Sequence, residues 1–273
     1  MVRHAMIMDL RTCIGCRACM AACSMENHTP FWEMDLKKWR TRVLDVKKGN
    51  KVVFFSTICM HCENPPCVPI CPTGASYRDT EKGVVLVNYE KCIGCGYCIH
   101  ACPYDARYLL DENDVAEMKV RYIQPTEHYK LHVDKCTFCV HRWDNEDIPE
   151  ELREPACVAT CVGHARIWVD LDDPNDPHVK EYIESGLAKP LSPELGTHPR
   201  VYYVIPEEFK DETPKYTIDT TAISLSEQYE KPLKRLVELA AGVTALAVVG
   251  NAIKDKIKGG HGEEEETEAE GGE

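Results

Sequence analysis

The sequence predicts an α+β fold in which two intertwined halves are followed by a single C-terminal transmembrane helix. Three observations lead to this prediction. Sixteen cysteines fall into four motifs of four. Short β-rich segments precede the first three motifs, so a strand, a cysteine loop and a helix recur in that order. One long apolar run lies near the C-terminus of the 273-residue chain.

The first predicted element is a strand at Ala5–Leu10, which leads into motif one, CIGCRACMAAC. Motif one contains Cys13, Cys16, Cys19 and Cys23. Its first three cysteines are three residues apart. In bacterial iron–sulfur motifs with this spacing, three thiolates bind one [4Fe–4S] cluster and the fourth cysteine binds a neighbouring cluster. Residues 24–50 are polar and aromatic, and we expect a helix end and a loop there.

The next two motifs repeat this order. A strand is predicted at Lys51–Thr57, and motif two follows with a wider gap that contains Pro65 and Pro66. A strand at Gly83–Asn88 leads into motif three, KCIGCGYCIHACP, where Gly94 and Gly96 suit the positive φ angles of a backbone that wraps a cluster. The cysteines are Cys59, Cys62, Cys67 and Cys71 in motif two and Cys92, Cys95, Cys98 and Cys102 in motif three.

Motif four is interrupted. A polar connector is expected at Asp111–Val133, and a charged seventeen-residue insertion separates the two cysteine pairs, Cys136 with Cys139 and Cys157 with Cys161. Further strands are predicted at Arg166–Asp170 and Arg200–Ile205. The Pro-rich residues 171–200 between them are expected to form a loop with one short helix.

The apolar run Leu236–Ile253 is interpreted as a membrane helix. Its eighteen residues span about 27 Å as a helix, and flanking cations that snorkel can extend this to the ~30 Å hydrocarbon layer. The alternative is a helix packed on protein, which Glu238 and Asn251 favour. The acidic residues 259–273 are expected to be disordered.

Four motifs with sixteen thiolates predict four [4Fe–4S] clusters, and the crossed ligand rule assigns them. Motifs two and three are adjacent and form an inner ferredoxin-like half, and motifs one and four form an outer half around it. Below, the four predicted ligand sets are called sites I to IV. Site I is Cys71, Cys92, Cys95 and Cys98; site II is Cys59, Cys62, Cys67 and Cys102; site III is Cys23, Cys136, Cys139 and Cys157; site IV is Cys13, Cys16, Cys19 and Cys161.

The predicted domain boundaries follow from this scheme. The outer half takes residues 1–48 and 119–185, and the inner half takes 49–118. A C-terminal extension takes 186–232, the membrane helix 233–258 and the acidic tail 259–273.

Composition excludes several other classes. The net charge is −13, which disfavours a basic nucleic-acid-binding face. Clustered cysteines fit metal binding better than a disulfide framework. The sequence contains no Gly-rich nucleotide loop and no spare cysteine nucleophile. It therefore does not predict an active site within this chain.

The cationic residues and histidines near the motifs are not predicted to act on the clusters as ligands or tuning groups. Arg17, Lys91 and Lys135 are expected to be solvated or paired with acids rather than to tune clusters. Because no motif lacks a cysteine, ligation by histidine is not expected, and packing or a hydrogen bond to sulfur is preferred for the histidines near the motifs, His61, His100, His141 and His164.

The four motifs together resemble those of the iron–sulfur subunits of complex molybdopterin oxidoreductases. The segments GTHPRVYYVI, KYTIDTTAISL and KPLKRLVELAAG narrow the resemblance to the beta subunit of membrane-bound formate dehydrogenases. It implies a non-catalytic electron-transfer subunit that links a molybdenum or tungsten pterin subunit to a membrane cytochrome b or quinone-reactive subunit. The inner motifs are then expected to face the catalytic partner and the outer ones the membrane.

The resemblance also implies a location on the outer face of the cytoplasmic membrane. The first residues, MVRHAMIMDLRTC, contain neither an apolar h-region nor a twin-Arg pair, so export is expected to depend on a partner's signal. Two alternatives remain: an iron–sulfur subunit of a polysulfide, thiosulfate or other terminal reductase with reversed electron flow, and a structural zinc protein.

Overall fold

The computed structural model describes residues 3–31, 38–121 and 131–212. The chain divides into two units, Met1–Ala222 and Ile223–Glu273, and every described residue belongs to the first. The predicted membrane helix and acidic tail lie outside the described residues. Within the described ranges, no helix is long and apolar enough to span a bilayer.

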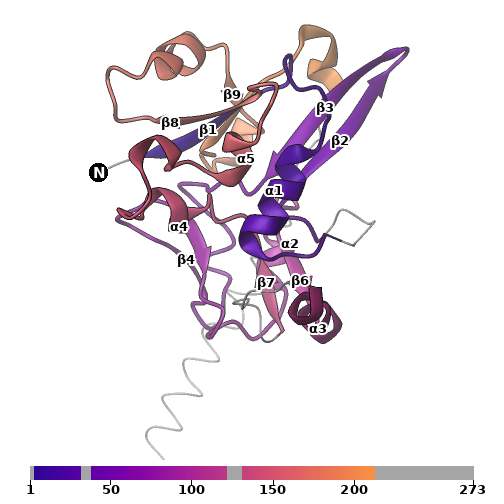
Figure 1. Ribbon diagram of the computed structural model, residues 1–273, viewed down its shortest axis with the longest axis vertical. Helices are drawn as coiled ribbons and strands as arrows, with labels where there is room; N and C mark the ends of the chain where they lie inside the picture. Colours follow the sequence, from indigo (N-terminus) through magenta and orange to yellow (C-terminus); the bar gives the residue numbers. More distant parts are fainter. Residues whose placement is uncertain (1–2, 32–37, 122–130, 213–273) are drawn as a thin grey trace, which may run out of the picture. The chain divides into compact units, whose positions relative to one another are not determined.

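A four-stranded sheet joins the beginning of the chain to its later segments (Figure 1). Strand β1 (His4–Asp9) pairs antiparallel with β8 (Arg166–Asp170) and parallel with β10 (Val201–Val204). Strand β9 (Lys189–Pro190) extends the sheet beyond β10. The apolar run from Ala5 to Met8 in β1 is at most 1% exposed, as suits a central strand covered on both faces.

This sheet confirms three predicted strands, those at the N-terminus, at Arg166–Asp170 and near Arg200. It also explains how the outer half closes, because β1 precedes motif one and β8 follows motif four. Strand β10 belongs to the same sheet, although residues 186–232 were predicted as a separate extension.

A long hairpin contains the strand predicted at Lys51–Thr57 and a strand that was not predicted. Strands β2 (Thr41–Lys48) and β3 (Lys51–Ile58) pair antiparallel around a two-residue turn, where Gly49 has a φ of +60°. We expected residues 41–48 to be loop, which is wrong. Their charged side chains conceal the apolar face that carries the buried Val43. The hairpin spans the predicted domain boundary at 48/49.

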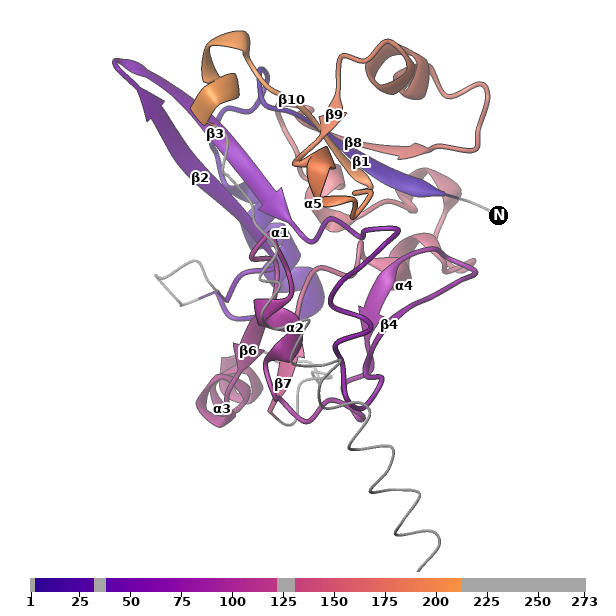
Figure 2. The ribbon, with the colours of Figure 1, turned by 180° about the vertical axis from the view of Figure 1, so that it is seen from behind.

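The inner region contains short elements (Figure 2). Strand β5 (Val85–Val87) confirms the prediction at Gly83–Asn88 and pairs with β4 (Ser76–Arg78). Helix α2 (Tyr97–His100) carries Cys98, and β6 (Tyr108–Leu110) pairs with β7 (His132–Asp134).

The expected polar connector at Asp111–Val133 contains helix α3 (Glu112–Arg121), which was not predicted from the sequence. Asp111 and Asp114 form a reciprocal capping pair, since each backbone N–H donates to the other's carboxylate at 2.8–2.9 Å. Val115 and Met118 pack on Leu110. Only these two apolar residues face the core, which left the helical period weak in the sequence.

The remaining described elements are short apart from α1 (Ala18–Asn27), which contacts α5 (Ala156–Ala159) and so joins motif one to motif four. The insertion in motif four forms α4 (Val140–Trp143) and the 3₁₀ turn η1 (Glu150–Leu152). The π-helix η2 (Val179–Glu184) and the 3₁₀ turn η3 (Pro193–Leu195) lie in the predicted loop, and η4 (Glu207–Glu212) ends the described chain.

Candidate functional site

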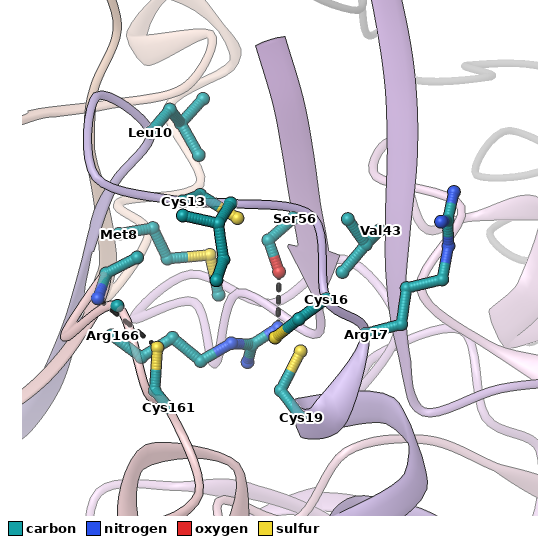
Figure 3. Close-up of a pocket in the computed structure, with 13 residues that line it drawn as sticks. Met8, Leu10, Cys13, Cys16, Arg17, Cys19, Val43, Ser56, Cys161 and Arg166 are labelled. Atoms are coloured by element: carbon teal, nitrogen blue, oxygen red, sulfur yellow. Dashed lines mark hydrogen bonds between the residues drawn. The ribbon is translucent and has the colours of Figure 1, made fainter.

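Site IV lies between the outer half's two motifs (Figure 3). All four of its thiols line one pocket. Cys13 and Cys16 follow β1, Cys19 lies in α1, and Cys161 follows α5. The strand pairing of β1 with β8 and the packing of α1 on α5 therefore bring these thiols together across 148 residues of sequence, from 13 to 161.

Sites I and II form two further pockets, one lined by each predicted set of four thiols. Each contains three cysteines of one inner motif and the last cysteine of the other. Arg107 lines both pockets. The two sites are therefore neighbours that share one buried guanidinium.

The site III thiols also lie together, and all four are buried. Burial raises the pKa of Cys23 well above its usual value, and the nearby charges of Cys139, Cys136 and Cys157 raise it further. The side-chain amide of Asn27 lies 3.7 Å from the sulfur of Cys23 and 3.8 Å from that of Cys139. The structure thus groups the same thiols as the crossed ligand rule does at all four sites.

One turn shape recurs at the four motifs. The second residue after the first cysteine of each motif has a positive φ: +68° at Gly15, +44° at His61, +68° at Gly94 and +56° at Phe138. Gly96, also singled out from the sequence, has a φ of +77°. His61 and Phe138 adopt this conformation despite their side chains. Their rings stack with centroids 3.8 Å apart.

The thiols and their neighbours fit bound iron–sulfur clusters. Backbone N–H groups donate to sulfur at 3.2–3.4 Å, namely those of Ala165 to Cys161, Phe138 to Cys136 and Ser76 to Cys71. Burial raises the pKa of Cys102 to about 12 and that of Cys157 to about 11. Because iron binds the thiolate, binding at these positions releases protons that burial otherwise holds on sulfur.

Several buried cations lie among the sites, and three of them, Arg107, Lys135 and Arg166, are 1–5% exposed. Lys135 is not solvated or paired with an acid as predicted, because its Nζ donates to the backbone carbonyls of Cys136, at 2.7 Å, and Val85. The prediction of solvation or pairing with an acid is confirmed for the other two cations. Arg17 Nη2 lies 2.7 Å from Asp45 Oδ1, and Lys91 is exposed.

Sequence reasoning missed the buried arginines Arg107 and Arg166. The available signal was their position, since each follows the last cysteine of its motif by five residues and is preceded by alanine.

Of the four histidines considered, His61 is completely buried, and burial holds its pKa well below the usual value. His141 Nε2 lies 2.8 Å from Glu26 Oε1.

All sixteen cysteines are free thiols. In the described part of the chain, no cluster of three or more His, Cys, Asp or Glu side chains is arranged to hold a metal ion. This finding concerns single ions, whereas a cubane spreads its four thiolates around separate iron corners.

Gly15→Ala is expected to weaken site IV specifically. A Cβ at this position would lie 2.5 Å from two ring atoms of Phe54, in addition to the strain of its φ of +68°. Gly49→Ala is the matched control, since it has a similar φ but open space around it and should lose only about 1–2 kcal/mol. Cluster content by EPR should fall in Gly15→Ala alone. Equal cluster content in both variants would contradict this packing argument.

The sequence of this chain is similar to those of known proteins. A 4Fe-4S dicluster domain family matches residues 50–171, and a second family of the same description matches residues 12–75. A tetrathionate reductase subunit of Salmonella typhimurium is 38% identical over 208 residues, which cover 74% of this chain and 72% of the relative. A sulfite dehydrogenase subunit of Allochromatium vinosum is 37% identical over 219 residues, covering 75% and 83%. The arsenate respiratory reductase iron–sulfur subunit of a Shewanella species is 34% identical over 237 residues, covering 74% and 96%.

Proposed function

The chain belongs to the family of iron–sulfur subunits with 4Fe–4S dicluster domains, and from this premise we propose that it carries electrons between a molybdopterin catalytic subunit and a membrane quinone-linked subunit. It binds four [4Fe–4S] clusters. Each bound cluster takes up and releases one electron at a time. The protein's own residues hold the clusters, separate them from water and place them in order.

The order I–II–III–IV is supported by shared lining residues and by charges that act between neighbouring sites. Sites I and II share Arg107. Cys59 of site II and Cys136 of site III belong to one buried core cluster. Burial is the main cause that raises the pKa of Cys136, and the charge of Cys59 adds to it. Sites III and IV meet where Arg166, a lining residue of site IV, lowers the pKa of Cys157 against the larger effect of burial.

The observation that carries the proposal is the exposure of the two ends of this series. Among the sixteen cysteines, Cys95 of site I and Cys16 of site IV are the exposed ones. In sites II and III every cysteine is buried except the half-buried Cys102. A relay needs one place to receive electrons and another to release them, with protected centres between.

Apolar side chains surround both exposed ends. Ile93 and Tyr97 are 61% and 50% exposed near site I, and Ile14 and Val162 are 61% and 66% exposed near site IV. Exposed apolar side chains grouped around a functional site are typical of protein interfaces. We assign site I to the catalytic partner and site IV to the membrane partner, in line with the expected orientation of the inner and outer motifs.

Two classes of catalytic partner are proposed. The resemblance of the C-terminal segments favours formate oxidation. The names of the relatives refer to tetrathionate reduction, sulfite oxidation and arsenate respiration, and these names favour an oxyanion of sulfur or arsenic as the substrate. Membrane attachment through residues 233–258, on the outer face, is part of the same proposal.

The test uses the native complex purified anaerobically from membranes. Formate should produce the EPR signals of reduced clusters if formate is the substrate. If the substrate is an oxyanion like those of the relatives, sulfite should produce these signals, or tetrathionate or arsenate should remove them from the pre-reduced complex. The subunit separated from its partners is the control, because it has no catalytic site and should respond to neither. A direct response of the isolated subunit, or none from the complex to either class, would contradict the proposal.

A further inference from the structure

Arg107 and Arg166 occupy equivalent positions in the two halves. Each lies five residues after the last cysteine of its motif, in the segments CPYDAR and CVGHAR. The local backbone is also alike, since Asp105 and His164, the third residues of these segments after the cysteine, both have a φ of +48°. In motif two the same position is Ser76, within CPTGAS.

In the inner half, the guanidinium of Arg107 lies between sites I and II. It is 3% exposed, and its Nη2 donates at 2.9 Å both to the sulfur of Cys67, in site II, and to the hydroxyl of Ser76. Burial raises the pKa of Cys98, in site I, and Arg107 opposes that rise. No described residue accepts from the buried Nε and Nη1 of Arg107, so these donors are left for cluster sulfur.

In the outer half, Arg166 points into site IV from β8 (Figure 3). It is 5% exposed, and its Nη2 donates to the hydroxyls of Thr41, at 2.6 Å, and Ser56, which belong to the β2–β3 hairpin. Helix α5, which carries Cys157 of site III, contacts β8. The guanidinium of Arg166 lowers the pKa of Cys157, where burial is the larger and opposite effect. Arg166 therefore faces both outer sites, as Arg107 faces both inner ones.

A fixed positive charge between two clusters acts on both of them. Each reduction adds one negative charge to a cluster, and a buried cation stabilises the reduced state more strongly than a cation in water does. Arginine keeps its charge at any pH at which the protein is folded. The hydrogen bonds described above join both guanidinium groups to hydroxyl groups. A hydroxyl group carries no charge, so these bonds leave the positive charge of each arginine in place.

We propose that Arg107 and Arg166 are paired potential-setting residues, each of which raises the reduction potentials of the two clusters in its own half. Arg107 serves sites I and II, and Arg166 serves sites III and IV. This inference rests on the proposed electron-transfer function, because it concerns the same clusters. It adds that each arginine acts on both clusters of its half, not on a single cluster.

The test is a redox titration of the whole complex followed by EPR, with Arg107→Gln and Arg166→Gln as each other's control. Arg107→Gln should lower the potentials of sites I and II, each by at least about 59 mV, which is a tenfold change in a one-electron equilibrium. Sites III and IV should remain unchanged, and Arg166→Gln should give the reverse pattern. Arg107→Lys and Arg166→Lys keep the charge and should restore most of each shift.

Equal shifts in all four clusters, or no shift in a variant that retains its full iron content, would overturn the proposal while leaving the electron-transfer function intact. A wild-type complex without four clusters would instead overturn the function itself. A measurement on the wild-type protein avoids any effect that a substitution has on folding. With ¹⁵N-guanidino arginine, pulsed EPR of the reduced inner clusters should detect ¹⁵N coupling, and its absence would also contradict the placement of Arg107.

Discussion

Cys102→Ser is expected to remove the cluster bound by Cys59, Cys62 and Cys67 and to spare the cluster of its own motif. Cys102 lines the site II pocket with those three thiols, although it belongs to motif three. Serine is a poor ligand for the soft iron of these clusters. The iron content should therefore fall from about sixteen to about twelve per chain, since each cluster contains four irons.

Electron transfer through the complex should fall to background in the same variant, because site II lies inside the series. Cys71→Ser is the reciprocal variant and should remove site I, whose other thiols come from motif three. EPR of the remaining clusters distinguishes the two variants. Loss of the cluster of the mutated cysteine's own motif would show that the ligands are not crossed.

Asp134→Ala is expected to destabilise the first unit by about 3–5 kcal/mol, the usual result of removing one partner from a buried ion pair. Asp134 is completely buried and accepts two hydrogen bonds of 2.9 Å from Arg40. It also accepts from the hydroxyls of Tyr89 at 2.8 Å and Tyr108 at 2.6 Å. The substitution leaves the buried guanidinium of Arg40 without its carboxylate.

Thermal unfolding of the cluster-loaded protein measures this effect, at roughly 2–4 °C per kcal/mol for a domain of this size. Asp134→Asn should behave similarly, because it keeps the volume and removes the charge. Glu208→Ala is the control, since it breaks an exposed pair with Lys51 and should leave the unfolding temperature unchanged. A small shift in both Asp134 variants would show that Arg40 finds another partner.

Local patterns in the sequence predicted the parts of the fold that local chemistry determines. The strands around β1, β3, β5, β8 and β10 are short apolar runs next to turn residues, so they could be recognised individually. The ligand sets could be grouped because cluster geometry dictates the cysteine spacing and the crossed fourth ligand. The structure brings the same thiols together, as the pocket around Cys161 shows.

The features that sequence reasoning missed depend on distant parts of the chain. Lys135 and Arg166 look like ordinary surface cations in the sequence, and only the packing of both halves around them makes them buried. Strand β2 is recognisable mainly from its partner β3, because Arg42, Asp45, Lys47 and Lys48 leave no clear apolar pattern in its own sequence. Helix α3 shows its two acidic capping residues but little apolar period.

The central claim is that sixteen thiols hold four clusters in series. The most direct measurement is the iron and acid-labile sulfide content of the anaerobically purified complex, combined with Mössbauer spectroscopy of the ⁵⁷Fe-labelled protein. We predict about sixteen irons per chain, all in [4Fe–4S] clusters. Stoichiometric zinc, or an iron content that corresponds to fewer than four clusters in freshly prepared material, would contradict this account.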